Sequence, residues 1–186
     1  MRISLHYRGR LNANGSPSHK HDIRLHFHRQ FQTLWSQFPL IEFKHWLTHK
    51  DSPIDDYSVL RTVGQHTFAP LVTERMNGIA ELSVTLLRPE KPGGLLTQGG
   101  DIDNRLKTLF DALTMPRHEN ALPRNLDSAA SPTPFFCLLE DDNLVTSLQV
   151  QTEQLLEPNV HPSEVDLVIH VHTRVTAMTV GNWPLV

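Results

Sequence analysis

The chain has 186 residues, a formal net charge of −3 and a single cysteine. This length suits one domain with a substantial core, and the charge argues against a strongly basic nucleic-acid binder. No apolar run approaches the ~20 residues of a membrane-spanning helix, and the N-terminus lacks the apolar core of a signal peptide. Because Cys137 has no partner for an intrachain disulfide, a reducing compartment fits. We expect a cytoplasmic protein with no membrane contact.

Positive charge is concentrated near the N-terminus. Residues 1–50 hold eight Lys or Arg against two acidic residues, whereas the rest of the chain holds nine Lys or Arg against eighteen acidic residues. This distribution fits a surface that follows phosphates beside a cation site. The same distribution is also compatible with uneven surface charge that has no function.

The first part of the chain predicts a strand and a helix. Apolar residues alternate over residues 3–7, as in a half-buried strand, and a turn signal follows at 14–17. Apolar residues then recur at helical spacing over 20–38, and Pro39 marks the end of this helix.

The signals over residues 40–75 are weaker. They indicate helical structure around 43–47 and a short strand within 63–72. After a turn, strict alternation of apolar residues predicts a strand over 80–86.

Residues 99–115 carry the most informative pattern of the chain. Two glycines precede Asp101 and Asp103, and either aspartate can cap a helix. Because the chain is expected to be still extended here, the two carboxylates can point the same way. The predicted helix has an apolar stripe at Leu106, Leu109, Phe110 and Leu113. Its polar face holds Asn104, Lys107 and Asp111.

The remaining residues predict further strands around an irregular segment. Pro116 ends the helix, and a Pro-rich surface excursion follows at 117–134. Strands are expected at 135–139, 144–150 and 165–171, of which the last two can pair antiparallel. The order of elements predicts a single α+β domain with a small mixed β-sheet and helices packed on it.

Three adjacent acidic residues, Glu140, Asp141 and Asp142, follow the apolar strand at 135–139. Carboxylates held together repel, so that one of them binds a proton unless a cation lies between them. A hard divalent cation with oxygen ligands resolves this conflict. A well-capped surface helix followed by a solvated acidic turn is the simpler interpretation.

The combination of these two motifs resembles the RusA family of Holliday-junction resolvases. That family carries Asp-x-Asp-Asn-x-x-Lys at a helix start, Asp-Ala-Leu later in the helix, and an acidic turn that leads into a strand. Here the first motif spans 101–107, the second 111–113 and the third 140–145. The chain departs from the family in its Pro-rich excursion, its N-terminal third and its lower basicity.

The resemblance implies a homodimeric, Mg²⁺-dependent endonuclease that resolves four-way junctions or related branched DNA in recombination and repair, with Mn²⁺ as an alternative ion. The implied catalytic residues are Asp101, Asp103, Lys107 and Asp142. The expected metal ligands are Asp101, Asp103 and Asp142, with Asp141 or Glu140 completing the set. Lys107 carries a point charge that suits contact with the scissile phosphate and its developing negative charge.

Basic residues of the two predicted helices are candidates for DNA contacts. We expect Arg24, Arg29 and Arg105 to contact phosphates, with His21 or His28 as additional partners. For the twelve histidines, solvated surface positions are favoured over a transition-metal site, since no cysteine cluster supports one. Trp35 and Trp46 are expected in the core, and Trp183 is a candidate for base stacking.

Two other functions fit the same residues. One is a non-catalytic module of the same fold that binds structured nucleic acid. The other is an α+β interaction domain in which a cation only stabilises the acidic turn.

Overall fold

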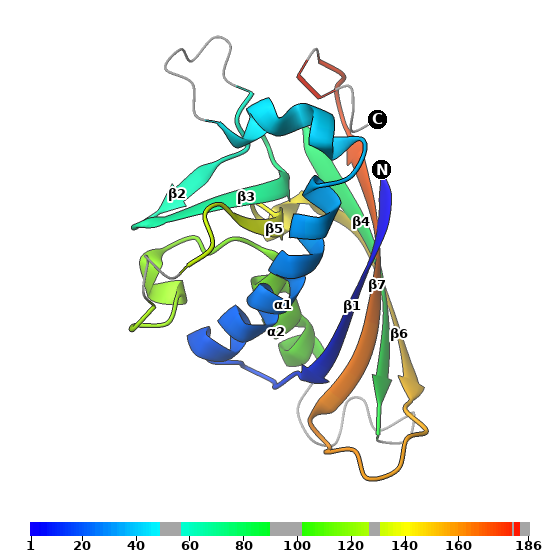
Figure 1. Cartoon of the computed structure of the whole chain (residues 1–186). Helices are drawn as coiled ribbons and strands as arrows, with labels where there is room; N and C mark the ends of the chain where they lie inside the picture. Colours follow the sequence, from blue (N-terminus) through cyan, green and yellow to red (C-terminus); the bar gives the residue numbers. More distant parts are fainter. Residues whose placement is uncertain (49–56, 90–101, 127–130, 180, 183–186) are drawn as a thin grey trace.

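The computed structural model describes residues 1–48, 57–89, 102–126, 131–179 and 181–182, and it shows an α+β fold with two mixed sheets (Figure 1). A four-stranded sheet has the order β1-β7-β4-β6, and a three-stranded sheet has the order β2-β3-β5. The first sheet is built from β1 (Arg2–Arg10), β7 (Glu164–Val175), β4 (Gly78–Arg88) and β6 (Val145–Gln154). The second is built from β2 (Arg61–Val63), β3 (His66–Val72) and β5 (Phe135–Leu139).

The four-stranded sheet buries one face. The predicted alternation in β1, β4 and β7 is confirmed, because every second residue of these strands lies in the core. The predicted pairing of the last two strands is wrong. The twelve-residue strand β7 lies antiparallel between β1 and β4, whereas β6 lies parallel to β4 at the edge. The reason is burial: β7 has a full apolar face to cover, and β6 is mostly exposed.

Helix α1 (Pro17–Trp35) begins three residues earlier than the pattern predicted and ends earlier as well. Ser16 caps it, because its hydroxyl accepts a hydrogen bond from the amide of His19 at 3.2 Å, and proline is well suited to the first helical position. After the helix ends at Trp35, a 3₁₀ segment (Leu40–Leu47) carries the buried Trp46. The predicted core positions of both tryptophans are therefore confirmed.

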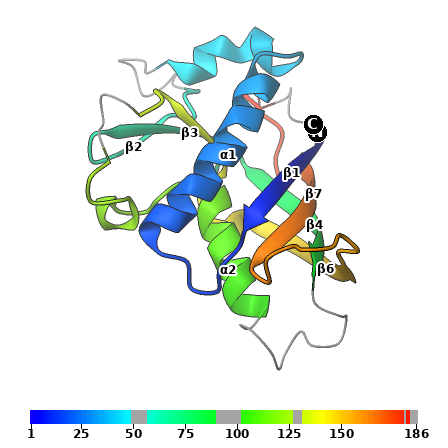
Figure 2. The ribbon, with the colours of Figure 1, turned by 60° about the horizontal axis from the view of Figure 1, so that its bottom comes forward.

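Helix α1 joins the two sheets. It contacts β1 of one sheet, β5 of the other and helix α2 (Ile102–Leu113), which lies beside it (Figure 2). Its buried side includes Ile23, Phe27, Phe31 and Trp35. These side chains fill the main core, so the hydrophobic effect holds the helix across both sheets.

In the three-stranded sheet, β5 confirms the strand predicted at 135–139, whereas β2 and β3 form where one short strand was expected. Strands β2 and β3 form an antiparallel hairpin that turns at Gly64, whose φ of +59° suits a residue without a side chain. The Pro-rich segment packs against this sheet through Leu122, which is buried with Phe68 and Phe135. Within the predicted surface excursion, Leu122 is therefore a buried exception; residues 127–130 lie outside the described part.

Parallel pairing places the end of β5 beside the end of α2. Strand β5 runs parallel to β3, and the amide of Glu140 donates to the carbonyl of Val72 at 3.0 Å. Just after α2, the amide of Met115 donates to the carbonyl of Leu139 at 2.9 Å. The residues that follow the helix and those of the acidic turn are consequently neighbours. No described helix is both long and apolar enough to cross a membrane.

Candidate functional site

The predicted aspartate pair lies at the start of α2. Asp101 lies outside the described residues. Asp103 is already in the first helical turn, where its carboxylate accepts from the amide of Asn104 at 2.7 Å. The expectation of extended chain at this position is therefore wrong. Lys107 lies one turn further on, exposed on the same side of the helix.

The three residues of the acidic turn have different partners. Glu140 is held by the guanidinium of Arg61 and by the amide of Glu74, which donates to it at 3.0 Å. Asp141 caps the short 3₁₀ helix η3 (Asp142–Leu144) by accepting from the amide of Asn143 at 3.0 Å. Glu140 is thus bound to its neighbours in the fold, which leaves Asp141 and Asp142 as the carboxylates open to another cation.

Arg117 connects the two remaining carboxylates. Its Nη2 lies 2.9 Å from Oδ1 of Asp141 and 2.8 Å from Oδ1 of Asp142. Burial tends to raise the pKa of Asp141, but the Asn143 amide, the Asp142 carboxyl and the Arg117 guanidinium together hold this pKa below its ordinary value. The two carboxylates raise the pKa of Arg117 in turn. They therefore converge on one cationic group.

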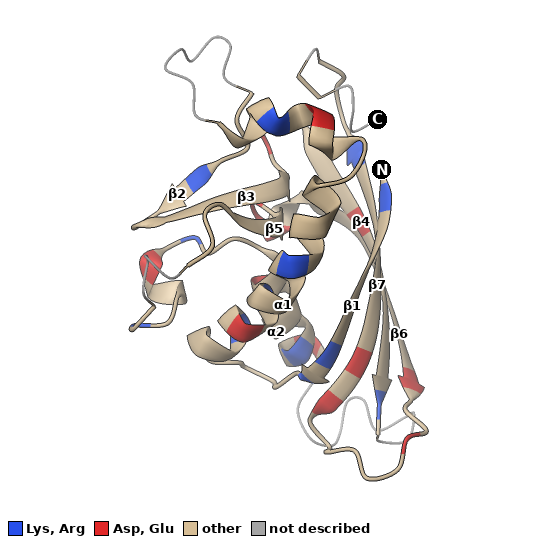
Figure 3. Cartoon of the chain, in the orientation of Figure 1, with Lys and Arg blue, Asp and Glu red and all other residues tan. Residues whose placement is uncertain are grey.

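A cavity of about 340 Å³ lies beside this contact, between α1, α2 and residues 115–121. It brings together Lys107 and Asp142, two of the predicted catalytic residues, which come from separate segments. Its charged lining comprises Lys20, Arg24, Lys107, Asp111, Arg117 and Asp142, and we call it the cationic pocket. Positive and negative positions are otherwise scattered over the described ribbon in the view of Figure 3, without a continuous basic stripe.

The candidate metal ligands are acidic side chains of the described residues. Among them, no group of three or more His, Cys, Asp or Glu side chains is arranged to hold a metal ion. The convergence of Asp141 and Asp142 on a cationic nitrogen shows that this pair suits a positive ion. Oxygen-only donors of this kind suit Mg²⁺ or Mn²⁺.

Two of the three arginines predicted to contact DNA are buried. Arg24 is 2 % exposed and donates to the carbonyls of Asp111 and Thr114 at 2.6 and 3.3 Å. Arg105 is 4 % exposed and donates to the carbonyl of Leu11 at 2.6 Å. The expectation that these two side chains lie on an exposed DNA-binding surface is wrong, because the fold uses them to join segments. Arg29 is exposed on α1, as that prediction requires.

Two histidines of α1, His21 and His28, are also buried. The predictions that they are solvated or contact phosphates are therefore wrong. His28 accepts from the amide of Phe136 at 2.9 Å. Burial lowers the pKa of His21 to about 4 and lowers that of His28 as well. Both rings act as core groups that are neutral at physiological pH. Trp183 lies outside the described residues.

Two residues of the pocket were missed by the sequence analysis. Lys20 lies one helical turn before Arg24, and its ammonium group pairs with the carboxylate of Asp111 at 2.7 Å. The four-residue spacing of the two basic residues was a usable signal. Arg117 had no such signal, because it lies in the Pro-rich segment and meets the acidic turn only through the tertiary fold.

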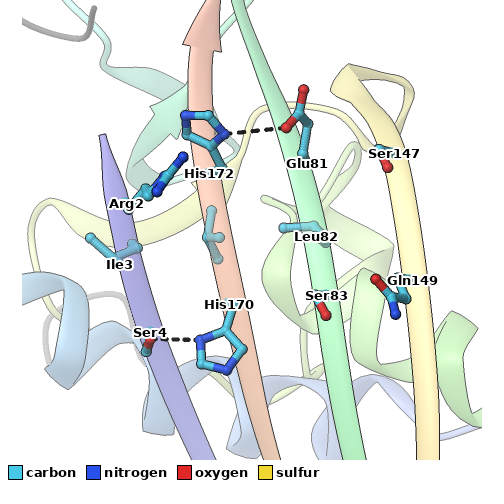
Figure 4. A pocket seen from close by; sticks show the side chains of 11 residues that line it. Arg2, Ile3, Ser4, Glu81, Leu82, Ser83, Ser147, Gln149, His170 and His172 are labelled. Atoms are coloured by element: carbon cyan, nitrogen blue, oxygen red, sulfur yellow. Dashed lines mark hydrogen bonds and ion pairs between the residues drawn. The ribbon is translucent and has the colours of Figure 1, made fainter.

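A larger hollow, of about 640 Å³, lies on the outer face of the four-stranded sheet and contains none of the predicted residues. Four of its polar side chains bind one another in two pairs (Figure 4). His172 lies 3.2 Å from the carboxylate of Glu81, which also pairs with Arg174, and His170 lies 2.9 Å from the hydroxyl of Ser4. This hollow is therefore a weaker candidate than the cationic pocket.

Comparison of the chain with protein-family models, curated proteins and solved structures finds no significant match. The resemblance to the RusA family stays a prediction from the two motifs.

Proposed function

We propose that the chain is a Mg²⁺-dependent endonuclease that cuts four-way junctions or related branched DNA by phosphodiester hydrolysis. The observation that supports this most is the cationic pocket, in which Lys107 of α2 and Asp142 of the acidic turn line one cavity. These residues were singled out from separate sequence motifs. A shared cavity is what a common reaction site requires.

The proposed roles follow from residue chemistry. Asp103, Asp141 and Asp142 would hold the metal ion together with Asp101. When bound, Mg²⁺ or Mn²⁺ polarises a phosphoryl oxygen and lowers the pKa of bound water. Lys107, exposed at the pocket, places a compact positive charge where a phosphate gains negative charge during hydrolysis. The amides of the first turn of α2 add donors that favour an anion.

A homodimer is part of this proposal. Symmetric resolution of a junction needs two cuts, and two copies related by a two-fold axis supply two sites. The molar mass of the free protein in solution and of its junction complex measures this. A monomer that still makes paired cuts would remove this part of the proposal.

One observation favours a non-catalytic junction-binding module as the second candidate. Arg117 already neutralises Asp141 and Asp142, and the described residues contain no complete metal-ligand group. Under this alternative, the chain binds branched DNA tightly without cutting it. The same experiment separates the two functions.

The test is cleavage of a labelled synthetic four-way junction beside linear duplex of the same sequence, with Mg²⁺ and with chelator. Wild type, Asp103→Asn and Asp142→Asn are compared. Asp166→Asn is the matched control, because this carboxylate lies on the outer sheet face and pairs with His6. We expect paired, Mg²⁺-dependent nicks on the junction with wild type and control only. Binding without nicks would favour the module, and retained cleavage by Asp103→Asn would falsify the assigned site.

A further inference from the structure

The cationic pocket carries an excess of positive charge that its own residues do not neutralise. Four basic side chains line it, Lys20, Arg24, Lys107 and Arg117, against the carboxylates of Asp111 and Asp142. Lys20 pairs with Asp111, and Arg117 pairs with Asp142 and Asp141. Lys107 and Arg24 have no ion-pair partner among the described residues. The pocket therefore offers a favourable place for an anion.

Arg24 gives this conclusion independent support, because its charge is buried. Its guanidinium donates to two backbone carbonyls, but Nη1 has no hydrogen-bond partner in the described part of the chain. The carboxylate of Asp111 acts on this guanidinium but already pairs with Lys20, and a buried cation with incomplete hydrogen bonding is costly. The carbonyls at the end of α2 compensate part of this cost, and an anion in the adjoining pocket would compensate more.

Arg117 is placed to change partners. Met115 fixes the backbone nearby through its bond to Leu139, whereas the side chain of Arg117 is 61 % exposed. Ion pairs with this exposure are screened by solvent and contribute little to stability. A divalent cation at Asp141 and Asp142 would therefore displace the guanidinium easily. Because Arg117 also lines the cationic pocket, the released group remains beside Lys107.

We propose that the cationic pocket binds a phosphate group of the substrate strand, and that Arg117 contacts this phosphate only after a divalent cation has displaced it from Asp141 and Asp142. This inference rests on the proposed function, since it assigns the phosphate subsite and its regulation to the same site. Arg117 then couples the two ligands: cation binding raises phosphate affinity, and phosphate binding raises cation affinity by the same factor. Its planar guanidinium suits both carboxylate and phosphate oxygens.

The probe is thymidine 3′,5′-bisphosphate, which carries phosphate esters but cannot be resolved as a junction. Its affinity for the full-length protein is measured by titration calorimetry with and without Ca²⁺, a hard cation that takes the same oxygen ligands. For wild type we expect at least a tenfold gain in affinity on addition of Ca²⁺. For Arg117→Ala we expect the gain to shrink below threefold. Arg124→Ala is the matched control, because Arg124 is exposed in the same segment and lies outside the pocket.

A second variant releases Arg117 without any cation. Asp141→Asn combined with Asp142→Asn should bind the bisphosphate in the absence of Ca²⁺ about as tightly as wild type binds it with Ca²⁺. Adding Arg117→Ala to this pair controls for the general loss of negative charge and should abolish most of the gain. Equal affinity of the double and triple variants would contradict a role for Arg117.

The outcomes separate this inference from the proposed function. Absence of bisphosphate binding to wild type, or an unchanged Ca²⁺ effect in Arg117→Ala, overturns the phosphate subsite even if junctions are cut. Binding that depends on Arg117 without any junction cleavage leaves the subsite in place and removes the nuclease. Thermal unfolding of each variant verifies that it is folded, and the exposure of Arg117 predicts little change in stability.

Discussion

Two hollows of the described part of the chain, the one on the outer sheet face and the cationic pocket, differ in how their charged groups are held. The hollow on the outer sheet face is nearly twice as large, about 640 Å³ against about 340 Å³. Its Glu81 is shared by His172 and Arg174, so the group is neutralised locally. The cationic pocket is smaller, but it has a buried guanidinium with one unpartnered nitrogen and an exposed lysine. The burial of one of these cationic groups, rather than volume, distinguishes the cationic pocket from the outer hollow, whose Arg2 is not buried.

The largest expected effect concerns catalysis at the smaller hollow. We expect Lys107→Met to reduce the rate of junction cleavage by about 10²–10³-fold, because the charge that faces the phosphate is lost. Thermal stability should hardly change, since the side chain is exposed. In the outer hollow, Glu81→Gln should change the rate less than about twofold. Equal losses in both variants would show that the comparison of the two hollows is mistaken.

The next effect concerns the stability of the cationic pocket. Replacing Arg24 by Met leaves the carbonyls of Asp111 and Thr114 without their donors in a buried position. We expect the free energy of unfolding to fall by about 2–4 kcal/mol, measured by urea denaturation. An unchanged or higher stability would mean that the burial cost of the charge outweighs its hydrogen bonds.

The buried histidine beside this region predicts a dependence of stability on pH. Burial lowers the pKa of His21 to about 4 in the native state, while the unfolded chain takes up a proton near pH 6.5. The contribution of neutral His21 is thus complete above pH 6.5 and is lost as the pH falls toward 4. We expect the free energy of unfolding to drop by about 2 kcal/mol over this range. His21→Phe should flatten the profile, and a profile identical to wild type would contradict the assignment.

The smallest effect is expected on the outer sheet face. Arg174→Met removes one exposed ion pair with Glu81 and leaves His172 in contact with the same carboxylate. The melting temperature should shift by less than about 1 °C, because exposed ion pairs contribute little. A shift as large as that of Arg24→Met would mean that the outer hollow also stores an unbalanced charge.

Local sequence patterns predicted the elements whose buried face can be recognised within one segment of the chain. The alternation around Leu82 and Ile169 identified two central strands, because each has one apolar face. The pattern did not reveal that β7 separates β1 from β4, since pairing depends on residues far apart in sequence. The start of α1 was also misplaced, although Ser16 and Pro17 form a recognisable helix start.

The candidate site was predictable only in part, for a similar reason. Lys107 and Asp142 stand in motifs with their own local signals, and the fold places both in one pocket. The bridge from Arg117 to Asp142 joins residues that no local pattern connects. Arg24 and Arg105 were misjudged because a positive charge is more often exposed than buried. Their hydrogen bonds to backbone carbonyls exist only once the helices have packed.

The hydrogen bond from the Met115 amide to the Leu139 carbonyl ties the end of α2 to the end of β5. This bond holds the arginine that follows one end close to the acidic residues that follow the other, so its opening loosens their contact. The exchange of the Met115 amide proton with deuterium reports this opening as a single event. If a divalent cation and a phosphate both stabilise the closed arrangement, each will slow this exchange, and the two together will slow it more than either alone.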